Sequence, residues 1–330
     1  MIKCKLLSLT FYVDNFEVFN ITLKSGTILK GLKFMKKCVI LLNAYSKMKE
    51  PLNQANRLKD ELFKLGVLAD IKRNDGFLLG IKDSKVTSNL KEYDFCVFLD
   101  KDKYLLNMIE KSGLKVFNTP SSIEYCDDKM TTYIRLAGNG VPLVKTLPGL
   151  LCYSKKARVK KEALLQIEKQ LDYPIVVKES FGSLGKGVYL AKNREELFSI
   201  MRKLKTLPHL FQEFISSSAG VDFRIIVIGK KAVASMKRFS KSDFRSNIAL
   251  GGSGINETPP NEFIKVAEKC AQVLNLDYCG VDLLIAKDGS PLVCEVNSNA
   301  FFDGIERVSN VNVAKLYAEH LVKEVYGEIK

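Results

Sequence analysis

The sequence predicts a mixed α/β and α+β protein in which two α+β lobes follow a small α/β domain. Three observations support this prediction. Strand-like and helical segments alternate from Lys37 onward, which is typical of a small α/β domain. A glycine-rich loop then separates two strand-like segments, and two later strands carry acidic residues among apolar ones. The chain of 330 residues is long enough for two or three domains.

The α/β domain is expected over residues 35–118. Its predicted elements are a helix at Gln54–Leu65 and strands at Cys38–Asn43, Leu68–Lys72, Asp94–Leu99 and Leu114–Phe117. Residues 1–34 form an N-terminal extension, because Met35 stands at the start of the first core strand. Two interpretations of this extension stay open: it is a hairpin, or it is not native sequence and translation begins at Met35.

The first lobe is expected over residues 119–205. Thr119 and the Pro-Ser-Ser that follows provide turn and N-cap residues for a helix that reaches about Ala137. Further helices are predicted at Lys160–Gln170 and Arg194–Lys203, and strands at Pro174–Lys178 and Val188–Ala191.

The second, larger lobe is expected over residues 206–330. Its predicted elements are the two acidic strands, helices at Asn261–Leu274 and Val311–Val325, and strands near His209–Phe214, Asp222–Ile228 and Ala232–Arg238. No internal repeat interrupts this pattern.

The composition limits the classes of partner. Lys and Arg (51) outnumber Asp and Glu (37), and the resulting net charge of +14 favours anionic partners such as nucleotides or acidic peptides. No aromatic and basic RNA-binding signature is present, so nucleic acid is the less favoured partner. The two histidines lack metal-like or triad-like spacing, which gives histidine-based hydrolysis little support.

The cysteines and apolar runs predict a cytoplasmic protein. The eight cysteines are scattered and include no CxxC pair, as expected for reduced core residues. The longest apolar runs are strand-sized, so no membrane span is expected. The N-terminal apolar stretch is broken early by Asp14 and Asn15, which disfavours a secretory signal.

A candidate metal site lies near the C-terminus. Asp282 follows Gly280-Val in one apolar strand, and Glu295 and Asn297 end the next strand, Pro291–Asn297. Ionised carboxylates are rarely retained among apolar residues without a compensating cation. Two carboxylates and an amide suit Mg²⁺, which completes its coordination with water and substrate phosphates. The alternative is a pair of acids at solvent-facing strand ends.

A candidate phosphate-binding loop follows Lys178. The segment Glu179-Ser-Phe-Gly-Ser-Leu-Gly-Lys-Gly187 has three glycines and two serines, so its backbone N–H groups can approach a phosphate closely. Its spacing fits neither a Walker loop nor a dinucleotide fingerprint. An ordinary hairpin whose glycines supply positive φ remains the alternative.

Polar residues on the following strands extend the candidate site. Glu213 lies between apolar residues, where a carboxylate suits an adenine amino group or a ribose. Arg224, Arg238 and Arg245 could clamp an acidic substrate or a triphosphate, because arginine binds carboxylate and phosphate with two parallel hydrogen bonds. A solvated basic strand face is the alternative.

The order of these segments resembles the ATP-grasp enzymes, and within them the RimK-type α-L-glutamate ligases. The resemblance runs from about Met35 to the end of the chain and depends on four segments in order: Asp243-Phe-Arg-Ser-Asn247, Gly280-Val-Asp282, Glu295-Val-Asn297 and Gly304-Ile-Glu306. It implies an ATP-grasp fold preceded by a small pre-ATP-grasp α/β domain, with residues 119–205 as the small lobe and 206–330 as the large lobe.

The resemblance also implies residue roles. Lys129, at the start of the first lobe, and Lys178 would contact the ATP phosphates, with Ser183, Gly185 and Gly187 in the loop over them. The adenine would lie at Glu213 and Phe214, and the ribose at Asp222. The implied catalytic residues are Arg224, Arg245 and Asn247, with Arg245, Ser246 and Asn247 near the reacting phosphate. Asp282, Glu295 and Asn297 would hold Mg²⁺ or Mn²⁺, as two ions. Lys129 as an ordinary helix-surface lysine stays an alternative.

The implied activity is ATP-dependent carboxylate–amine ligation through an acyl-phosphate. Glutamate or another amino acid would be joined to a carboxylate-bearing acceptor, such as an acidic peptide or coenzyme, by a homo-oligomer, a dimer or a tetramer. Alternatives are a ligase of coenzyme or peptide natural-product biosynthesis that uses a different amino acid, a non-catalytic nucleotide-binding regulatory protein, and a simple ATPase or kinase.

One segment departs from the family pattern. Where many members have Ser-Pro-Gly after the metal-binding asparagine, this chain has Ser298-Asn-Ala-Phe-Phe-Asp303. Phe301 and Phe302 either shape an acceptor pocket or fill the core, and large aromatic side chains are more often core residues. The sequence therefore favours the core for both.

Overall fold

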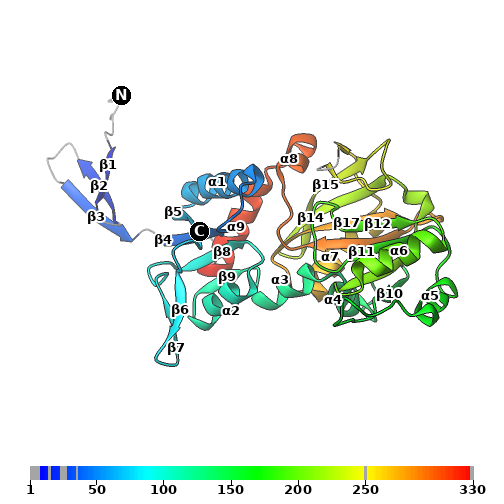
Figure 1. Ribbon diagram of the computed structural model, residues 1–330. Coiled ribbons are helices and arrows are strands. Elements are labelled where there is room, and N and C mark those ends of the chain that lie inside the picture. The colour runs from blue at the N-terminus through cyan, green and yellow to red at the C-terminus, as the bar shows by residue number, and fades with distance from the viewer. Residues whose placement is uncertain (1–7, 14–15, 23–27, 35, 249–250, 328–330) are drawn as a thin grey trace.

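The computed structural model describes residues 8–13, 16–22, 28–34, 36–248 and 251–327. The first strands, β1 (Ser8–Val13), β2 (Phe16–Thr22) and β3 (Ile28–Phe34), form an antiparallel sheet in the order β1-β2-β3. Figure 1 shows this sheet extending away from the rest of the chain. Met35 itself lies outside the described residues, and a translation start there stays a prediction.

The next part of the chain is a parallel sheet with helices. Its strands have the order β5-β4-β8-β9, and the hairpin β6-β7 lies outside that sheet. The elements are β4 (Lys36–Leu42), α1 (Lys49–Lys64), β5 (Val67–Arg73), β6 (Leu79–Lys82), β7 (Lys85–Ser88), β8 (Phe95–Leu99), α2 (Lys103–Lys111) and β9 (Lys115–Phe117). The buried residues of β4 and β8 are apolar throughout, as in a parallel sheet covered on both faces.

The small lobe is an antiparallel sheet in the order β10-β13-β11-β12. Its elements are α3 (Pro120–Asp127), α4 (Lys129–Leu136), β10 (Thr146–Pro148), α5 (Lys161–Glu168), β11 (Ile175–Glu179), β12 (Val188–Ala191), α6 (Arg194–Leu204) and β13 (His209–Glu213). Residues from α5 and α6 share one buried apolar cluster with β11 and β13, so the helices cover one face and leave the other face free to form a wall of a site.

The large lobe is a second antiparallel sheet in the order β16-β15-β14-β17-β18. Its elements are the 3₁₀ helix η1 (Ser216–Ser218), β14 (Val221–Ile228), β15 (Lys231–Phe239), β16 (Ser253–Ile255), α7 (Asn261–Val273), β17 (Tyr278–Ile285), β18 (Pro291–Asn297), α8 (Asp303–Ser309) and α9 (Val313–Tyr326). Figure 1 shows the small lobe, in green, beside this sheet.

The two faces of the large sheet have different partners. On one face, Phe223, Ile225 and Val281 pack with residues of α7 such as Phe263. On the other face, Ile226 belongs to the cluster that contains α1, α9 and the parallel sheet. The terminal helix α9 therefore packs against both the large sheet and the N-terminal α/β domain, and the predicted domain limits stay predictions.

Asn118 connects the N-terminal domain to the large sheet. Its side-chain amide donates to the carbonyl oxygens of Tyr278 and Ser298, and its side-chain oxygen accepts from the backbone N–H groups of Asp277 and Tyr278. Asn118 is buried, and every one of these groups is thereby satisfied, which is the condition for a buried polar side chain to be tolerated.

The single helix expected up to Ala137 is two helices. The break falls at Asp128, whose backbone is extended and whose carboxylate accepts hydrogen bonds from the N–H groups of Met130 and Thr131. A side chain that caps a new N-terminus favours such a break. The backbone N–H of Lys129 also bonds to the carbonyl of Ser180, so the break fixes Lys129 beside the glycine-rich loop.

Several short elements were not predicted from the sequence. They are α2, α8, the hairpin β6-β7, and the strands β10 and β16. Helix α2 did carry a signal, because Asp102 caps it by accepting from the N–H groups of Tyr104 and Leu105. The strands have three or four residues each, which is too short for a clear hydrophobic period.

Phe301 and Phe302 have different environments. Phe302 is completely buried in the cluster that includes α9, as expected for a core residue. Phe301 is half-buried and lines the large cavity between the domains, so the preference for the core was wrong for Phe301.

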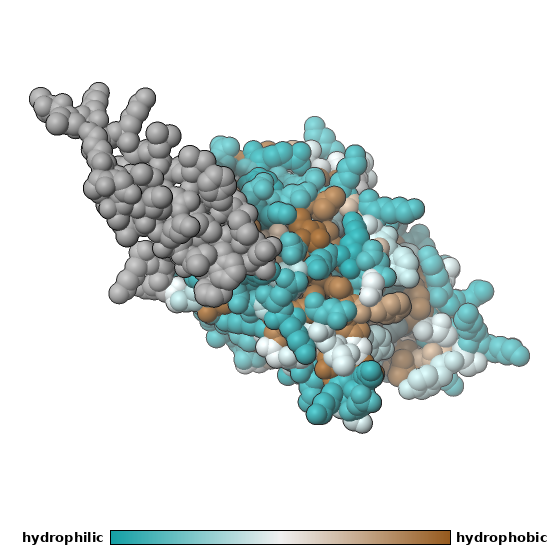
Figure 2. Space-filling model, turned by 90° about the vertical axis from the view of Figure 1, so that its left-hand side faces the viewer, coloured by the Kyte–Doolittle hydropathy of each residue, from teal (hydrophilic) through white to brown (hydrophobic). Residues whose placement is uncertain are grey.

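No helix among the described residues is both long and apolar enough to cross a membrane. The face shown in Figure 2 is mostly hydrophilic, with hydrophobic side chains in small separate groups. Scattered exposed apolar residues of this kind are normal for a folded surface.

The packing of Phe302 predicts a large stability effect. Phe302→Ala should lower the free energy of unfolding by about 3–5 kcal/mol, because the removed ring leaves a cavity that its neighbours cannot fill. Chemical denaturation followed by circular dichroism measures this change. Phe301→Ala is the matched control and should cost less than about 2 kcal/mol, because its ring is only partly buried. Equal losses in the two variants would contradict the assignment of Phe302 to the core.

Candidate active site

Charged residues alternate across three neighbouring strands of the large sheet. Arg238 on β15 is opposite Asp222 on β14, and Arg224 on β14 is opposite Asp282 on β17. Residues two apart on a strand share a face, so Asp222 and Arg224 lie on one face. The register alone therefore places acids and bases in contact, and we call these four residues the Asp/Arg array.

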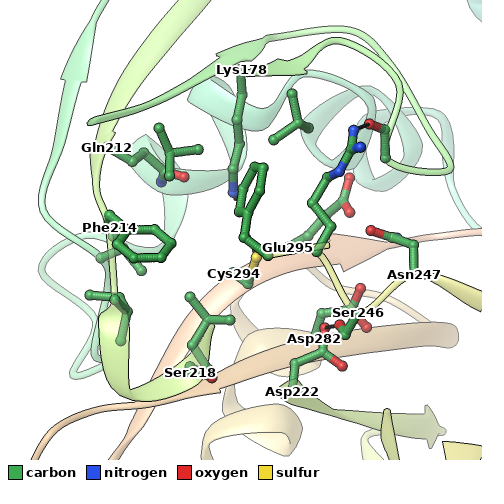
Figure 3. Close-up of a pocket in the computed structure, with 18 of the residues that line it drawn as sticks. Lys178, Gln212, Phe214, Ser218, Asp222, Ser246, Asn247, Asp282, Cys294 and Glu295 are labelled. Carbon is green, nitrogen blue, oxygen red and sulfur yellow. Dashed lines mark hydrogen bonds between the residues drawn. The ribbon is translucent and has the colours of Figure 1, made fainter. Parts of the chain in front are cut away.

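Each of the two cross-strand pairs in the array has two parallel hydrogen bonds. Arg238 donates to both carboxylate oxygens of Asp222, and Arg224 does so to Asp282, at 2.6 and 2.7 Å. Arg238 also lies 2.9 Å from Asp282, and Ser246 donates to Asp222. Asp222, Ser246 and Asp282 lie close together in Figure 3.

The arginines control the charge state of Asp282. Burial by itself would raise the pKa of this carboxyl, but the guanidinium groups of Arg224 and Arg238 outweigh burial and lower the pKa below its ordinary value. The two carboxylates in turn raise the pKa of Arg238 despite the opposing effect of burial. Both shifts favour the charged forms of Asp282 and Arg238.

An irregularity in β18 brings two consecutive side chains to this face. The register between β17 and β18 shifts after Asp282, where Glu295 is the partner of Asp282 but Val293 is the partner of Leu283. The intervening Cys294 has no partner, as in a β-bulge. Cys294 and Glu295 both line the cavity, whereas Val293 is in the core beneath.

Lys178 faces Cys294 across the cavity. Its side chain is 9% exposed, and its ammonium lies 3.6 Å from the Cys294 sulfur. Figure 3 shows Lys178 pointing from the small lobe toward this thiol. Burial raises the pKa of Cys294, against the opposing effect of Lys178, so the thiol is neutral at ordinary pH. The salt bridges of the described residues include none with Lys178, and its positive charge lacks a counterion there.

Lys129 connects the loop to the acidic strand. Its buried ammonium donates to the carbonyl oxygen of Gly182 at 2.7 Å and lies 3.3 Å from Glu295. The lysine begins α4, so the helix break at Asp128 determines where this cation points. It is not a surface lysine.

Arg245 holds the other side of the loop. It donates to the carbonyl oxygen of Gly185 at 2.7 Å and pairs with Asp243, which it keeps at a lowered pKa. Ser183 and Gly185 line the cavity, whereas Gly187 is not among its lining residues. Gly187 has a φ of +71°, and a Cβ there would meet Glu179 at 2.9 Å. The backbone at the base of the hairpin thus requires Gly187 for its positive φ. For this glycine, the hairpin interpretation gave the correct reason.

An apolar slot completes the first cavity. The cavity has a volume of about 100 Å³. Phe214 lines it and contacts Phe244 edge to face, and the aliphatic part of the wall is Val144, Val176, Val188, Ile215, Val221 and Leu284. Glu213 lines the cavity from an exposed position, and the buried Gln212 beside it was not among the predicted site residues. The combination of a flat apolar slot and nearby cations suits a nucleotide.

A second, larger cavity adjoins the first. It has a volume of about 1180 Å³ and lies between the N-terminal domain and the large lobe. Both cavities are lined by Ser183, Arg238, Asn247 and Glu295. A molecule in one cavity can therefore meet a molecule in the other at this shared wall. Asn43 and Asp100 line the second cavity and were missed, although Asn43 ends one predicted strand and Asp100 directly follows another.

The predicted metal ligands lie together on two strands. Asp282 and Glu295 are cross-strand partners, and Asn297, opposite Gly280, lines the second cavity. Within the described residues, no group of three or more His, Cys, Asp or Glu is placed to hold a metal ion, and the predicted set has only two acids. The donor set nevertheless fits Mg²⁺, because two carboxylates and an amide oxygen are hard ligands. The side-chain nitrogen of Asn297, Nδ2, is buried and has no hydrogen-bond partner. In this structure, Lys129 and the two arginines supply the positive charge that Asp282 and Glu295 require.

The geometry agrees with similarities to known proteins. Residues 126–321 match the model of the RimK-like ATP-grasp domain. The chain is 34% identical over 223 residues to human N-acetylaspartylglutamate synthase A, and the matched region covers 67% of this chain and 56% of that protein. It therefore spans little more than half the length of that relative. It is also 35% identical over 222 residues to the "Probable alpha-L-glutamate ligase" of Maridesulfovibrio salexigens, over 66% of this chain and 71% of the relative.

A solved structure has the same fold. The RimK domain protein ATP-grasp from Sphaerobacter thermophilus superimposes with a TM-score of 0.65, over 86% of this chain and 98% of that one, at 18% identity. The predicted fold, two α+β lobes after a small α/β domain, is thereby confirmed.

The Asp/Arg array predicts a stability effect. Arg238→Met should lower the free energy of unfolding by about 3–5 kcal/mol, because Asp222 and Asp282 would each lose a buried positive partner. Denaturation at neutral pH measures the change. Lys237→Met is the control, since Lys237 pairs with Glu257 at a partly exposed position and should contribute at most about 1 kcal/mol. A similarly small decrease in the free energy of unfolding in both variants would show that the array does not stabilise the sheet.

Proposed function

The chain belongs to the RimK-like ATP-grasp family, and from this premise we propose that it is an ATP-dependent ligase that joins a carboxylate to an amine through an acyl-phosphate. One observation carries the proposal. Lys178 is a buried cation whose neighbour is a neutral thiol, and it faces a glycine-rich loop across a small cavity. A buried charge needs a compensating partner, and a nucleotide phosphate would supply it.

The proposed nucleotide position follows from the cavity walls. The adenine lies in the apolar slot at Phe214, with Glu213 at its edge, and the ribose lies near Asp222. The phosphates extend toward Lys178, Lys129 and the loop with Ser183 and Gly185. Both oxygens of Asp222 accept from Arg238, so a ribose hydroxyl would share this carboxylate with the arginine. Gly187 contributes by shaping the loop.

The loop contacts suggest how the lysine and arginine exchange partners. Lys129 and Arg245 now donate to the carbonyl oxygens of Gly182 and Gly185. Phosphate oxygens are stronger acceptors than peptide carbonyls because they carry charge. Bound phosphates would therefore take over these donors, while the loop covers them and keeps water from the acyl-phosphate.

The reaction then takes place at the shared wall. A substrate carboxylate oxygen attacks the γ-phosphorus of ATP, and the bond to the bridging oxygen breaks to release ADP. The amino group next loses the proton of its ammonium form, and its nitrogen attacks the acyl carbon. The bond to phosphate breaks, and the released phosphate can take the second proton that the nitrogen loses. Asn247 lies in this wall, Arg245 and Ser246 line the first cavity, and Arg224 lines the second. These four residues would stabilise the charge that develops.

Asp282, Glu295 and Asn297 would hold Mg²⁺, as two ions in our proposal, and the metal would neutralise charge on the phosphates. In this structure the same acids interact with Arg224, Arg238 and Lys129. A metal at Glu295 would replace the contact with Lys129 and leave this lysine free to turn toward the phosphates, while Arg238 stays paired with Asp222.

The names of relatives suggest substrates. One relative is named for N-acetylaspartylglutamate and another for glutamate ligation, and the net charge of +14 favours anionic substrates. We propose glutamate as the amine and an acidic molecule as the carboxylate. We also propose a homo-oligomer in the cytoplasm; the cysteines of the described residues are all free, which suits a reducing compartment.

The assay combines purified protein, ATP and Mg²⁺ with each of the twenty amino acids, and with N-acetylaspartate, citrate or glutamate as the carboxylate. ADP release is followed by a coupled assay and products by mass spectrometry. Hydroxylamine in place of the amino acid traps an acyl-phosphate as a hydroxamate. ADP release together with an amide or hydroxamate supports a ligase. Tight ATP binding without ADP or product would favour a nucleotide-binding regulatory protein, and ADP without amide or hydroxamate a simple ATPase.

Two substitutions test the site. Lys178→Ala and Glu295→Ala should each lower the rate of ADP formation at least about 100-fold, because Lys178 would neutralise charge on the phosphates directly and Glu295 would hold the metal that does so. Circular dichroism checks the fold of both variants. Lys192→Ala, at an exposed position just beyond β12 in the small lobe, is the control and should keep the wild-type rate. Near-normal turnover in either folded variant would overturn the proposed site.

A further inference from the structure

Asn43 and Asp100 lie side by side at the point where two parallel strands end. Leu42 and Leu99, the last residues of β4 and β8, are register partners, and Asn43 and Asp100 directly follow them. In the strand order β5-β4-β8-β9, β5 lies on one side of β4 and β8 lies on the other side. The direction of the strand order therefore switches between β4 and β8. Ligands of open α/β sheets bind outside the carboxyl ends of the strands at such a switch point.

The carboxylate of Asp100 has only neutral partners. The side-chain amide of Asn43 donates to both of its oxygens at 3.1 and 3.2 Å, and the backbone N–H of Lys101 donates at 2.7 Å. The side chain of Lys101 points elsewhere, to Asp127 at 2.7 Å. Among the salt bridges of the described residues none involves Asp100. Burial is the main cause of the raised pKa of this carboxyl, and Asp102 and Asp127 add to it.

Asp100 is also tied to the candidate active site. The side-chain amide of Asn299 donates to its backbone carbonyl at 2.8 Å, and Asn299 follows the acidic strand β18 by two residues. Asp100 lines the second cavity together with Glu295 and Asn297. A molecule held at Asp100 can therefore extend through this cavity to the wall that the two cavities share.

We propose that Asp100 binds the ammonium group of the α-amino acid that the ligase uses as its amine, with Asn43 fixing the orientation of the carboxylate. The proposal rests on the proposed ligase function and adds the residue that selects the amine. An ammonium group supplies the positive charge that Asp100 lacks. Lys49 and Arg307 line the same cavity and form no ion pair among the described residues, and they provide partners for the carboxylates of an amino acid.

The test compares wild-type protein with Asp100→Asn, which keeps the size of the side chain and removes its charge. The first substrate is the amino acid that wild-type protein joins in the screen of twenty, and the second is hydroxylamine, a small amine that is largely uncharged at neutral pH. We expect the KM for the amino acid to rise about 10- to 100-fold, the value of one charged hydrogen-bonding contact. The KM for ATP should change less than about twofold, and hydroxamate formation should fall much less than amide formation.

Asp102→Asn is the matched control, because Asp102 caps α2 and is not among the residues that line the cavity. It should leave the KM for the amino acid unchanged. Three outcomes would overturn the role of Asp100. The KM for the amino acid could stay unchanged in Asp100→Asn, or the rates with the two amines could fall equally. Wild-type protein could also form the hydroxamate but join no amino acid. Wild-type protein that forms neither hydroxamate nor amide would instead overturn the ligase function itself.

Discussion

The Asp/Arg array is the interaction on which the site depends. Three strands, β15, β14 and β17, bring Asp222, Arg224, Arg238 and Asp282 to one face, and each charge is balanced by a neighbour across the sheet. Buried ions are tolerated only when they are paired in this way. The array therefore keeps a carboxylate ionised at the centre of the sheet, and the apolar opposite face packs on α7.

One residue of the array, Arg238, lies in the wall that the two cavities share. Arg238, Asn247, Glu295 and Ser183 line both, so a nucleotide in the smaller cavity and other substrates in the larger one would meet at a charged wall. The small lobe contributes Lys178 and the loop, and the N-terminal domain contributes Asp100 and Asn43. The proposed function thus requires three parts of the chain that are distant in sequence. Asn118 and α9 connect two of these parts, the N-terminal domain and the large lobe.

Much of the fold was predictable because local patterns and tertiary packing agree. The main strands and helices have clear hydrophobic periods, and Asp222, Asp282 and Glu295 stand out because acids are rare inside apolar strands. The short elements β6, β7, β10 and β16 gave no such signal. Helix α2 and the break at Asp128 were signalled only by aspartate caps, and a polar residue before a helix is common enough that this signal is easily missed.

The sequence by itself determined the fold class, the glycine-rich loop between two strands, and the acids and arginines that make the site, because these depend on residue type and spacing along one segment. Only the tertiary structure decided their contacts. Strand register paired Asp282 with Arg224, a bulge turned both Cys294 and Glu295 into the cavity, and sheet topology placed Asp100 beside Asn43. Register, bulges and strand order arise from pairing between distant segments, which no local pattern specifies.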